Sequence, residues 1–306
     1  MFFSSKTKSI PLTDFIYAFV ARSKKQVAYK RCYRNLARHL EAFHHATGLS
    51  ISTDSFSEGT TEELIEYLKG VGLMLSSIDS ILGKLAASLR RASKRGYSVD
   101  FGFENIHVEY EDPCTVYLTV PELEKINSLK GLSKEAQAVR DRFLVGCFTA
   151  LRISDFKRLT VENNFSSDGR LIHIKTQKTG ESVIIPVHHI IREILVRNDD
   201  VLPKMPSQQA FGKTIKRICR KAGICDSILW ERTVGKKIVC KKLKKYEMVS
   251  SHTARRSGAT NMYLAGIPTA RIMLLTGHKT EQAFFRYIRI SKSENAESLI
   301  HYDFFK

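Results

Sequence analysis

The sequence lacks any apolar run long enough to place a helix across a membrane. A bilayer span needs roughly 18 to 20 consecutive apolar residues, and no stretch of the chain approaches that length. Residues 1–11 also lack an apolar core followed by small residues, so we expect no signal peptide. These absences argue against a membrane-spanning or secreted protein.

Disulfide frameworks and paired-cysteine metal sites are missing as well. The cysteines are scattered and form no CxxC pair. They are Cys32, Cys114, Cys147, Cys219, Cys225 and Cys240. The adjacent pairs His44-His45 and His188-His189 lack the spacing with which proteins ligate one metal ion. We therefore expect a reduced, cytoplasmic protein without a metal site.

Acidic residues are too few to balance the basic ones. Lysine and arginine total 49 against 31 aspartates and glutamates, which gives a formal net charge of +18 and a pI near 9.7. Such an excess favours nucleic acid as a partner, because binding releases counterions from phosphates. An anionic membrane surface, or a protein that is merely basic and soluble, remains an alternative. The length of 306 residues fits one large or two medium folded domains.

The first hundred residues show the periodicity of helices. Apolar residues recur every three or four positions within 12–22 and 26–46, as they do on one face of an amphipathic helix. Thr60 and Glu63 have the spacing of a capping box and predict the start of a third helix. A fourth helix ends in a basic cluster that either complements the helix dipole or contacts DNA phosphates. The cluster consists of Arg90, Arg91, Lys94 and Arg95.

The second half combines predicted helices with two hairpins. Periodicity disappears near Pro113, so we place a linker at 101–116 between a helical domain at 1–100 and a second domain at 117–306. There, Thr119 and Glu122 form another capping box before a long helix expected at 133–149. Residues 169–187 predict a β-hairpin, and the lysine-dense segment 230–246 predicts a second, basic one. The expected fold is mainly α with small β-hairpins, and the second domain is α+β.

Six polar residues of the second domain are candidates for chemistry, although each has an ordinary structural explanation when taken alone. An arginine after an apolar run can cap helix carbonyls, and a lysine at a hairpin turn is usually solvated. A histidine and an arginine three residues apart share a helix face, which is a weak signal by itself. A tyrosine among apolar residues often belongs to the core. The six are Arg152, Lys178, His252, Arg255, His278 and Tyr287.

In combination, and in this order, these residues resemble the tyrosine recombinase family of phage integrases, Xer-type recombinases and DNA invertases. The motifs are ALRISD, the lysine of the hairpin turn, SHTARRSGAT, LLTGHKT and FFRYIRI. The nine-residue step from His278 to Tyr287 matches the family habit, and HTARRSGAT is similar to integrases from mobile elements of the Bacteroidetes. The resemblance covers 117–306 and extends more loosely to the helical domain, which is similar to the family's SAM-like core-binding module.

The resemblance implies phosphoryl transfer on DNA without a metal or another cofactor. Arg152 and Arg255 would hold the phosphate, because a guanidinium offers a planar fork to two oxygens. Tyr287 would attack phosphorus and form a covalent 3′-phosphotyrosine. His252 is the candidate that accepts or relays the phenolic proton. Lys178 occupies the family's general-acid position and would protonate the leaving 5′ oxygen.

Three neighbouring residues receive supporting roles. His278 would hydrogen-bond a non-bridging phosphate oxygen. Asp155, at i+3 from the first arginine, is expected to orient basic groups or to form an ordinary surface ion pair. Arg256 points about 100° away from its neighbour Arg255 on a helix, so it is expected to meet the DNA backbone or a nearby carboxylate.

The expected partners are double-stranded DNA and further copies of the chain. Two domains would form a clamp around the duplex, as in the family. The basic hairpin would contact the DNA backbone or remain solvated, with Lys236, Lys237, Lys241, Lys242, Lys244 and Lys245 as candidates. We expect a monomer in solution and a tetramer on DNA. The apolar tail would dock on a neighbouring protomer or on its own domain; it contains Leu299, Ile300, Tyr302, Phe304 and Phe305.

Two alternatives remain on sequence grounds. A type IB topoisomerase uses a similar residue set but nicks and reseals one strand without exchange. A DNA-binding protein that has lost catalysis would need none of the six residues, all of which are present.

Overall fold

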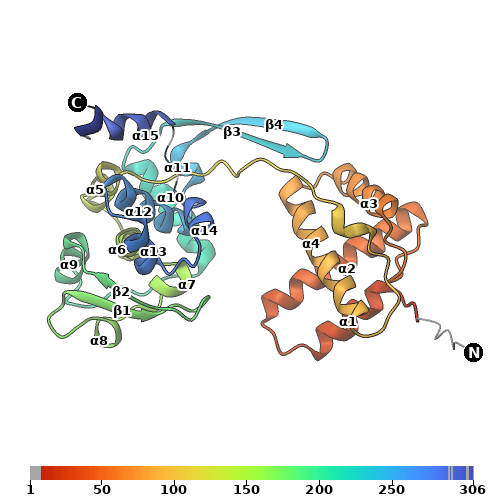
Figure 1. Cartoon of the computed structure of the whole chain (residues 1–306). Helices are drawn as coiled ribbons and strands as arrows, with labels where there is room; N and C mark the ends of the chain where they lie inside the picture. The colour runs from red at the N-terminus through yellow and green to blue at the C-terminus, as the bar shows by residue number, and fades with distance from the viewer. Residues whose placement is uncertain (1–7, 289, 291, 301–302, 306) are drawn as a thin grey trace, which may run out of the picture. The chain divides into compact units, whose positions relative to one another are not determined.

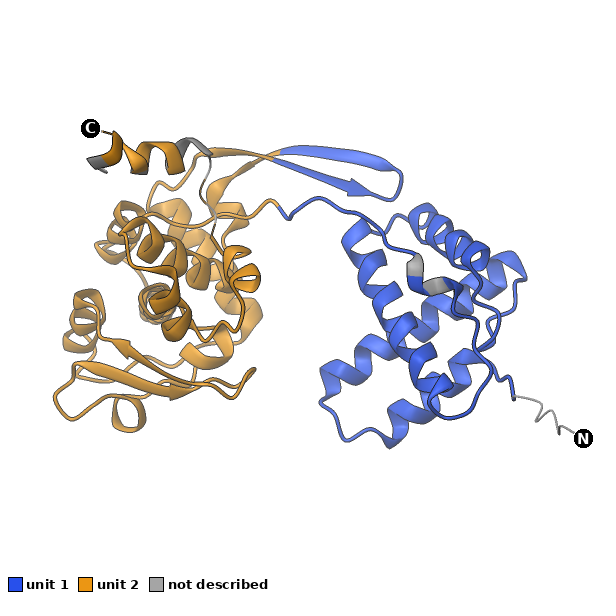
Figure 2. Cartoon of the chain, viewed as in Figure 1, with its two compact units in different colours: residues 1–113, 230–241 blue, residues 114–229, 242–306 orange. Residues whose placement is uncertain are grey.

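The computed structural model describes residues 8–288, 290, 292–300 and 303–305, and it divides into two compact units. Unit 1 comprises residues 1–113 and 230–241, and unit 2 comprises 114–229 and 242–306 (Figure 2). The division follows Pro113, within the segment where the linker was expected. The assignment of 230–241 to unit 1 was not anticipated from the sequence.

Unit 1 is a helical domain around one apolar core (Figure 1). Its helices are α1 Leu12–Arg22, α2 Val27–Thr47, α3 Glu58–Gly70, α4 Leu75–Ser93 and the short 3₁₀ helix η1 Gly102–Asn105. Helix α1 matches the predicted range, and α2 differs from it by one residue at each end. The repeat of three and four that predicted α1 buries Phe15, Ile16 and Phe19 in this core.

The predicted start of the third helix was wrong. The N-cap is Ser57, whose hydroxyl accepts a hydrogen bond from the backbone N of Thr60, and α3 begins at Glu58. Thr60 therefore lies inside the first turn instead of capping it. Serine is as good a cap as threonine, and its extended backbone with ψ 171° suits that position.

Unit 2 packs helices around a larger core and adds one small sheet. The helices are α5 Val120–Asn127, α6 Lys134–Thr149, α7 Ile153–Phe156, α8 Val161–Asn164, α9 His189–Val196, α10 Gln208–Lys221, α11 Lys245–Met248, α12 Ser251–Leu264, α13 Thr269–Thr276, α14 Glu281–Phe285, α15 Lys292–Leu299 and η2 Asp303–Phe305. The capping box of Thr119 and Glu122 and the helix after Ser133 are confirmed.

The first predicted hairpin is confirmed as an antiparallel pair of strands. Strand β1, Leu171–Lys175, pairs with β2, Ser182–Pro186, in a register that runs from Leu171 opposite Pro186 to Lys175 opposite Ser182. Alternate residues of each strand are buried, which anchors one face of the hairpin on the core. The register leaves 176–181 as the turn, with Lys178 in it.

The second predicted hairpin is also confirmed. Strands β3, Ser227–Val234, and β4, Lys237–Lys244, form a separate two-stranded sheet. Its turn packs within unit 1, where Gly235 N donates to Leu73 O at 2.8 Å. A side chain at Gly235 would clash with Lys69 O, and its φ of +61° also favours glycine.

Helices α6 and α12 pack closely at the centre of unit 2. Gly258 makes this possible, because an added Cβ would collide with Cys147 O and would lie 2.8 Å from the Cβ of Ala150. Ala150 ends α6 in the left-handed conformation with φ 50°, which turns the chain sharply into α7. The start of α7 and the middle of α12 thus lie next to the same turn.

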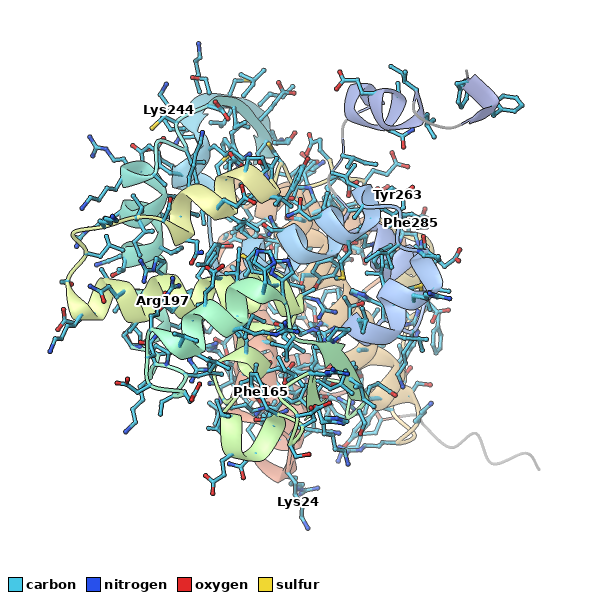
Figure 3. All side chains as sticks on the ribbon, turned by 90° about the vertical axis from the view of Figure 1, so that its left-hand side faces the viewer. Lys24, Phe165, Arg197, Lys244, Tyr263 and Phe285 are labelled. Carbon is cyan, nitrogen blue, oxygen red and sulfur yellow. The ribbon has the colours of Figure 1, made fainter. Side chains whose placement is uncertain are left out.

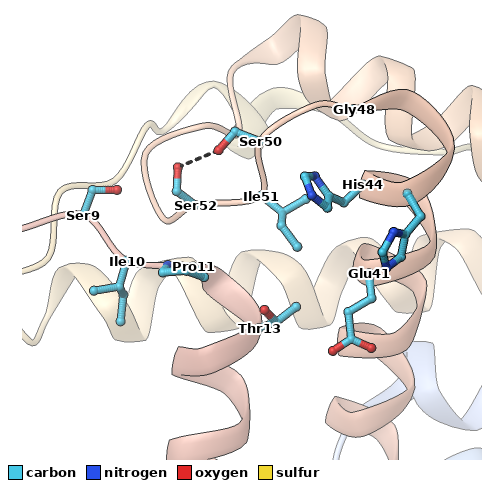
Figure 4. A pocket seen from close by; sticks show the side chains of 11 residues that line it. Ser9, Ile10, Pro11, Thr13, Glu41, His44, Gly48, Ser50, Ile51 and Ser52 are labelled. Atoms are coloured by element: carbon cyan, nitrogen blue, oxygen red, sulfur yellow. Dashed lines mark hydrogen bonds between the residues drawn. The ribbon is translucent and has the colours of Figure 1, made fainter.

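An open pocket of about 520 Å³ lies in unit 1 (Figure 4). The start of α1, the end of α2 and the loop at 48–52 line it, including Glu41, His44 and Ser50. The six candidate catalytic residues belong to unit 2, so this pocket is not the predicted site. Within the described residues, no helix is long and apolar enough to cross a membrane.

Candidate active site

Arg152 stands at the N-terminus of α7, just after the left-handed turn at Ala150. Its backbone is extended, with ψ 155°, so the residue acts as the N-cap of this one-turn helix. Within the described part of the chain, its buried Nη1 has no hydrogen-bond partner. A buried guanidinium N–H without an acceptor is costly unless a ligand supplies one.

Arg255 is almost completely buried in the second turn of α12. Its Nη1 donates to Ala150 O at 2.9 Å and its Nη2 donates to Thr276 O at 2.8 Å, while its buried Nε lacks a partner among the described atoms. Burial, followed by the positive charge of Arg152, lowers the pKa of Arg255 to about 10. It remains protonated at neutral pH, and two carbonyls fix its orientation.

His278 follows the left-handed C-cap of α13 at Gly277. Its Nε2 lies 2.9 Å from Nη2 of Arg255, and its Nδ1 lies 2.7 Å from Oγ1 of Thr276. A guanidinium can only donate, so Nε2 accepts and Nδ1 carries the proton. Burial and the charges of both arginines lower the pKa of His278 to about 3, which keeps the ring neutral.

Tyr287 lies in the turn after α14 and reaches the same place from the same chain. The centroid of its ring is 5.2 Å from Cζ of Arg255 and 5.0 Å from the ring centroid of His278. The surrounding segment is fixed by a small core of α12, α13 and α14 in which Phe284 is fully buried. Nearby, Tyr263 and Phe285 meet edge to face with centroids 6.4 Å apart (Figure 3).

His252 precedes Arg255 by one helical turn and is exposed. Partial desolvation lowers its pKa first, and the positive charges of Arg256, Arg255, Lys178 and Arg152 lower it further. Direct contacts thus join Arg255, His278 and Tyr287 in unit 2, and the charges of Arg152 and Lys178 act on the same group of side chains.

The turn that carries Lys178 is held from α7. The fully buried Asp155 accepts a hydrogen bond from the backbone N of Gln177 at 2.8 Å, through Oδ1. Arg158 donates to the same oxygen at 3.3 Å and also to Lys175 O. Asp155 thus orients a backbone segment as well as a basic side chain. Its spacing from Arg152 marked the residue as a candidate, but no pattern in the sequence identified the amide of Gln177.

Several basic residues expected at DNA in unit 1 have partners within the protein. Arg90 pairs with Glu104 at 2.8 Å, while the guanidinium of Arg91 lies 4.6 Å from the ring centroid of Phe19. Arg95 lies similarly over Phe15 at 5.4 Å. The remaining member of this cluster, Lys94, is exposed.

The basic residues of the second hairpin are divided in the same way. Lys236 pairs with Glu66 at 2.7 Å, and Lys245 pairs with Glu122 at the same distance in a largely buried position. The other four lysines, Lys237, Lys241, Lys242 and Lys244, are exposed, and Figure 3 shows Lys244 at the protein surface. In addition, Nη1 of Arg256 donates to Val116 O at 3.2 Å.

Residues with metal-ligating side chains are not clustered in the part of the chain that the structure describes. In the described ranges, no group of three or more histidines, cysteines, aspartates and glutamates is arranged to hold a metal ion. The pairs His44-His45 and His188-His189 instead make ring contacts, and the ring of His188 stacks on that of Phe148 with centroids 4.1 Å apart.

Models of known protein families match both the helical N-terminal part and the C-terminal part of the chain. Residues 117–294 match the model of the phage integrase family, and residues 11–108 match that of the phage integrase SAM-like domain. No curated protein sequence matches the chain significantly.

Solved structures share the fold at low sequence identity. The Tn1549 transposon integrase in complex with circular intermediate DNA is 16% identical, with a TM-score of 0.66, over 96% of this chain and 100% of that one. A lambda integrase dimer bound to a COC′ core site is 14% identical, with a TM-score of 0.64, over 92% and 78%. The XerH site-specific recombinase bound to a palindromic difH substrate is 16% identical, with a TM-score of 0.63, over 95% and 94%.

Proposed function

Because this chain belongs to the phage integrase family, we propose that it is a site-specific recombinase that cuts and rejoins DNA through a covalent 3′-phosphotyrosine. The observation that carries the proposal is the approach of Tyr287 to Arg255 and His278 within one chain, at 5.2 Å and 5.0 Å. Similar integrases were solved bound to DNA, which supports a DNA partner for this chain.

Arg152 and Arg255 form the phosphate clamp. Each has a buried guanidinium N–H without a partner among the described residues, and a phosphate oxygen is a suitable acceptor for both. Burial makes their charges more effective, because the local dielectric is lower than in water. The two carbonyls bound by Arg255 keep its unpaired Nε in place before DNA arrives.

Tyr287 supplies the nucleophile and His252 the base. The phenolic oxygen forms a bond to phosphorus as the bond from phosphorus to the 5′ oxygen breaks. The phenolic proton passes to His252, which is neutral at pH 7 because desolvation and nearby cations lower its pKa. The leaving 5′ oxygen takes a proton from Lys178. In the rejoining step a 5′ hydroxyl attacks the phosphotyrosine, and the protons return.

His278 acts on Arg255 in this proposal. Its accepting Nε2 and protonated Nδ1 join the guanidinium to Oγ1 of Thr276, which in turn donates to Ile272 O at 2.7 Å. The histidine therefore orients the clamp before DNA binds. A direct bond from His278 to a phosphate oxygen, as first expected, would require Nε2 to exchange its role as acceptor for that of a donor.

Binding of the DNA backbone falls to the exposed lysines. Lys94, Lys237 and Lys242 are the best candidates, because Arg90, Lys236 and Lys245 are neutralised by carboxylates. Each lysine that meets a phosphate adds to the salt dependence of binding.

The tail supports assembly on DNA. Ile300, Phe304 and Phe305 are 61%, 89% and 59% exposed, and Leu299 is partly buried, whereas Tyr302 lies outside the described residues. Such apolar side chains favour docking, and we propose a neighbouring protomer in a tetramer as the acceptor. The chain would be monomeric before it binds DNA. Light scattering with and without DNA, on the full chain and on one ending at Leu299, tests both statements.

Covalent trapping tests the function. Duplexes from a randomised library are incubated with the chain, and DNA that remains attached to protein after denaturation is sequenced to define the site. A duplex with this site and a nick next to the scissile phosphate should then trap wild type, while Tyr287→Phe should give no adduct. An adduct with Tyr287→Phe would reject the assigned nucleophile, and DNA binding without any adduct would favour a catalytically silent protein.

A relaxation assay separates strand exchange from topoisomerase activity. Supercoiled plasmid without the selected site should remain supercoiled, whereas two plasmids that carry the site should recombine. Efficient relaxation of the plain plasmid without recombination would favour a type IB topoisomerase.

A further inference from the structure

The turn between β1 and β2 is closed by its own hydrogen bonds. Thr176 N donates to Glu181 O at 2.8 Å, and Gly180 N donates to Thr176 O at 2.9 Å. The hydroxyls of Thr176 and Thr179 lie 2.8 Å apart. Because these hydrogen bonds join the two ends of the turn, a change in the position of Glu181 also changes the position of the backbone that carries Lys178, three residues earlier.

Glu181 is bound to the segment that carries His278. Its Oε1 lies 2.8 Å from Nζ of Lys279, the residue directly after His278. The two segments are also neighbours in the fold, since a Cβ on Gly277 would make ordinary van der Waals contact with two side chains of the hairpin, at 3.8 Å from Cβ of Glu181 and 3.5 Å from Cγ1 of Val183. The hydrogen bond and charge of Lys279 lower the pKa of Glu181, so the carboxylate is ionised at neutral pH.

The turn is therefore held on two sides by different residues. On one side, the buried Asp155 accepts the amide hydrogen of Gln177. On the other side, Lys279 holds Glu181. The two contacts flank Lys178 along the chain and connect its turn to the segments that carry Arg152 and His278.

We propose that Glu181 and Lys279 are positioning residues that hold the Lys178 turn against the His278 segment and so set the delivery of the proton to the leaving group. This inference rests on the proposed function, because it assumes that Lys178 is the general acid. Neither residue touches the phosphate in this role. Both side chains are largely solvent-exposed, at 45% and 67%, so their contribution to overall stability is small and their effect should be seen mainly in the rate.

A substrate that needs no acid isolates this role. When sulfur replaces the bridging 5′ oxygen, the leaving group is a thiol with a pKa of roughly 8.5, so it departs without protonation. Single-turnover cleavage of the selected nicked duplex is measured with the oxygen and the sulfur substrate at saturating enzyme. Lys279→Met and Glu181→Gln should each slow the oxygen substrate about fivefold. The sulfur substrate should change by less than about twofold under the same principle.

Charge reversal and a matched control complete the test. Glu181→Lys combined with Lys279→Glu should restore the rate that either single change lowers, because the ion pair is re-formed. Arg170→Met removes another exposed ion pair of the same hairpin, with Asp168 at 3.8 Å, and should leave both substrates unaffected. The melting temperature of every variant should remain close to that of wild type.

The outcomes distinguish the two levels of the proposal. Equal slowing of both substrates by Lys279→Met, or no slowing of either, would overturn the positioning role. Failure of the sulfur substrate to rescue Lys178→Ala would instead reject Lys178 as the acid. A wild-type chain that forms no adduct with either substrate would overturn the proposed function and this inference with it.

Discussion

The two hairpins of this chain both present lysines, but they hold them in opposite ways. The β1–β2 turn carries Lys178, and its backbone is fixed by the buried carboxylate of Asp155. In β3–β4 the lysines stand along exposed strands, and Lys236 is paired with Glu66. A high density of lysines therefore indicates a positively charged surface. A lysine on a fixed backbone can instead be positioned accurately enough to protonate a single atom.

The largest effect on the cleavage rate should come from replacing Lys178, the lysine whose backbone is fixed. Lys178→Ala should slow covalent adduct formation by about 10²- to 10⁴-fold, the usual contribution of a general acid. Lys242→Ala on the other hairpin is the control and should leave the single-turnover rate at saturating enzyme unchanged. Equal losses in the two variants would remove the distinction between the hairpins.

A smaller effect should follow when the fixed backbone is loosened. Asp155→Asn keeps the shape of the side chain but removes its charge from the bonds to Gln177 N and Arg158. A hydrogen bond to a charged group contributes about 1.5–3 kcal/mol, so the rate should fall roughly 10- to 100-fold. Asp168→Asn, at an exposed carboxylate, provides the comparison. An unchanged rate would mean that Asp155 does not position the turn.

Acidic pH should affect chemistry more than it affects lysine-mediated binding. The pKa of His252 is lowered in the folded chain, so the ring is neutral above that pKa and becomes protonated as the pH falls through it. If His252 is the base, cleavage should then decline by about tenfold per pH unit. The same shift adds stability that is present above the unfolded pKa of about 6.5 and is lost as the pH falls toward the folded value. Rates measured between pH 5 and 8 should lose this acid limb in His252→Gln.

The exposed lysines of β3–β4 should alter the salt dependence of binding and have the smallest effect on rate. Replacing Lys237, Lys241 and Lys242 by glutamine should reduce the slope of log K against log salt by about 2 to 3, at roughly 0.9 per phosphate contact. Single-turnover rates at saturating enzyme should stay constant. Lys236→Gln is the matched control, because its ion pair with Glu66 already neutralises the charge. An equal change of slope in the control would reject the division into paired and available lysines.

Local patterns were sufficient to predict much of the fold. The periodicity of 12–22 defined α1, the Thr119–Glu122 spacing defined the start of α5, and the apolar segments on either side of Lys178 placed it in a hairpin turn. These features depend on residues close together in the chain, where backbone geometry fixes which side chains meet. The six candidate catalytic residues were found because their order resembles a family. Their convergence was an expectation that the sequence alone had no means to test.

Pairings between distant residues were not predictable in the same way. Lys245 reaches Glu122 across 123 positions, and Lys279 reaches Glu181 only because α13 packs on the hairpin. A lysine in a sequence carries no sign of whether a carboxylate will neutralise it. The misplaced cap of α3 had a local cause, since Ser57 and Thr60 are both good caps and only the backbone decides between them.

The absent side chain at Gly258 limits how the chain can vary. A single added methyl would meet both Cys147 O and Ala150, and it would wedge α12 away from the turn that accepts Arg255. Because His252 and Arg255 both belong to α12, a displacement of this helix would move both side chains, although neither residue had been altered. The close approach of the two helices thus fixes the orientation of both residues, and natural variation at this position should be confined to glycine.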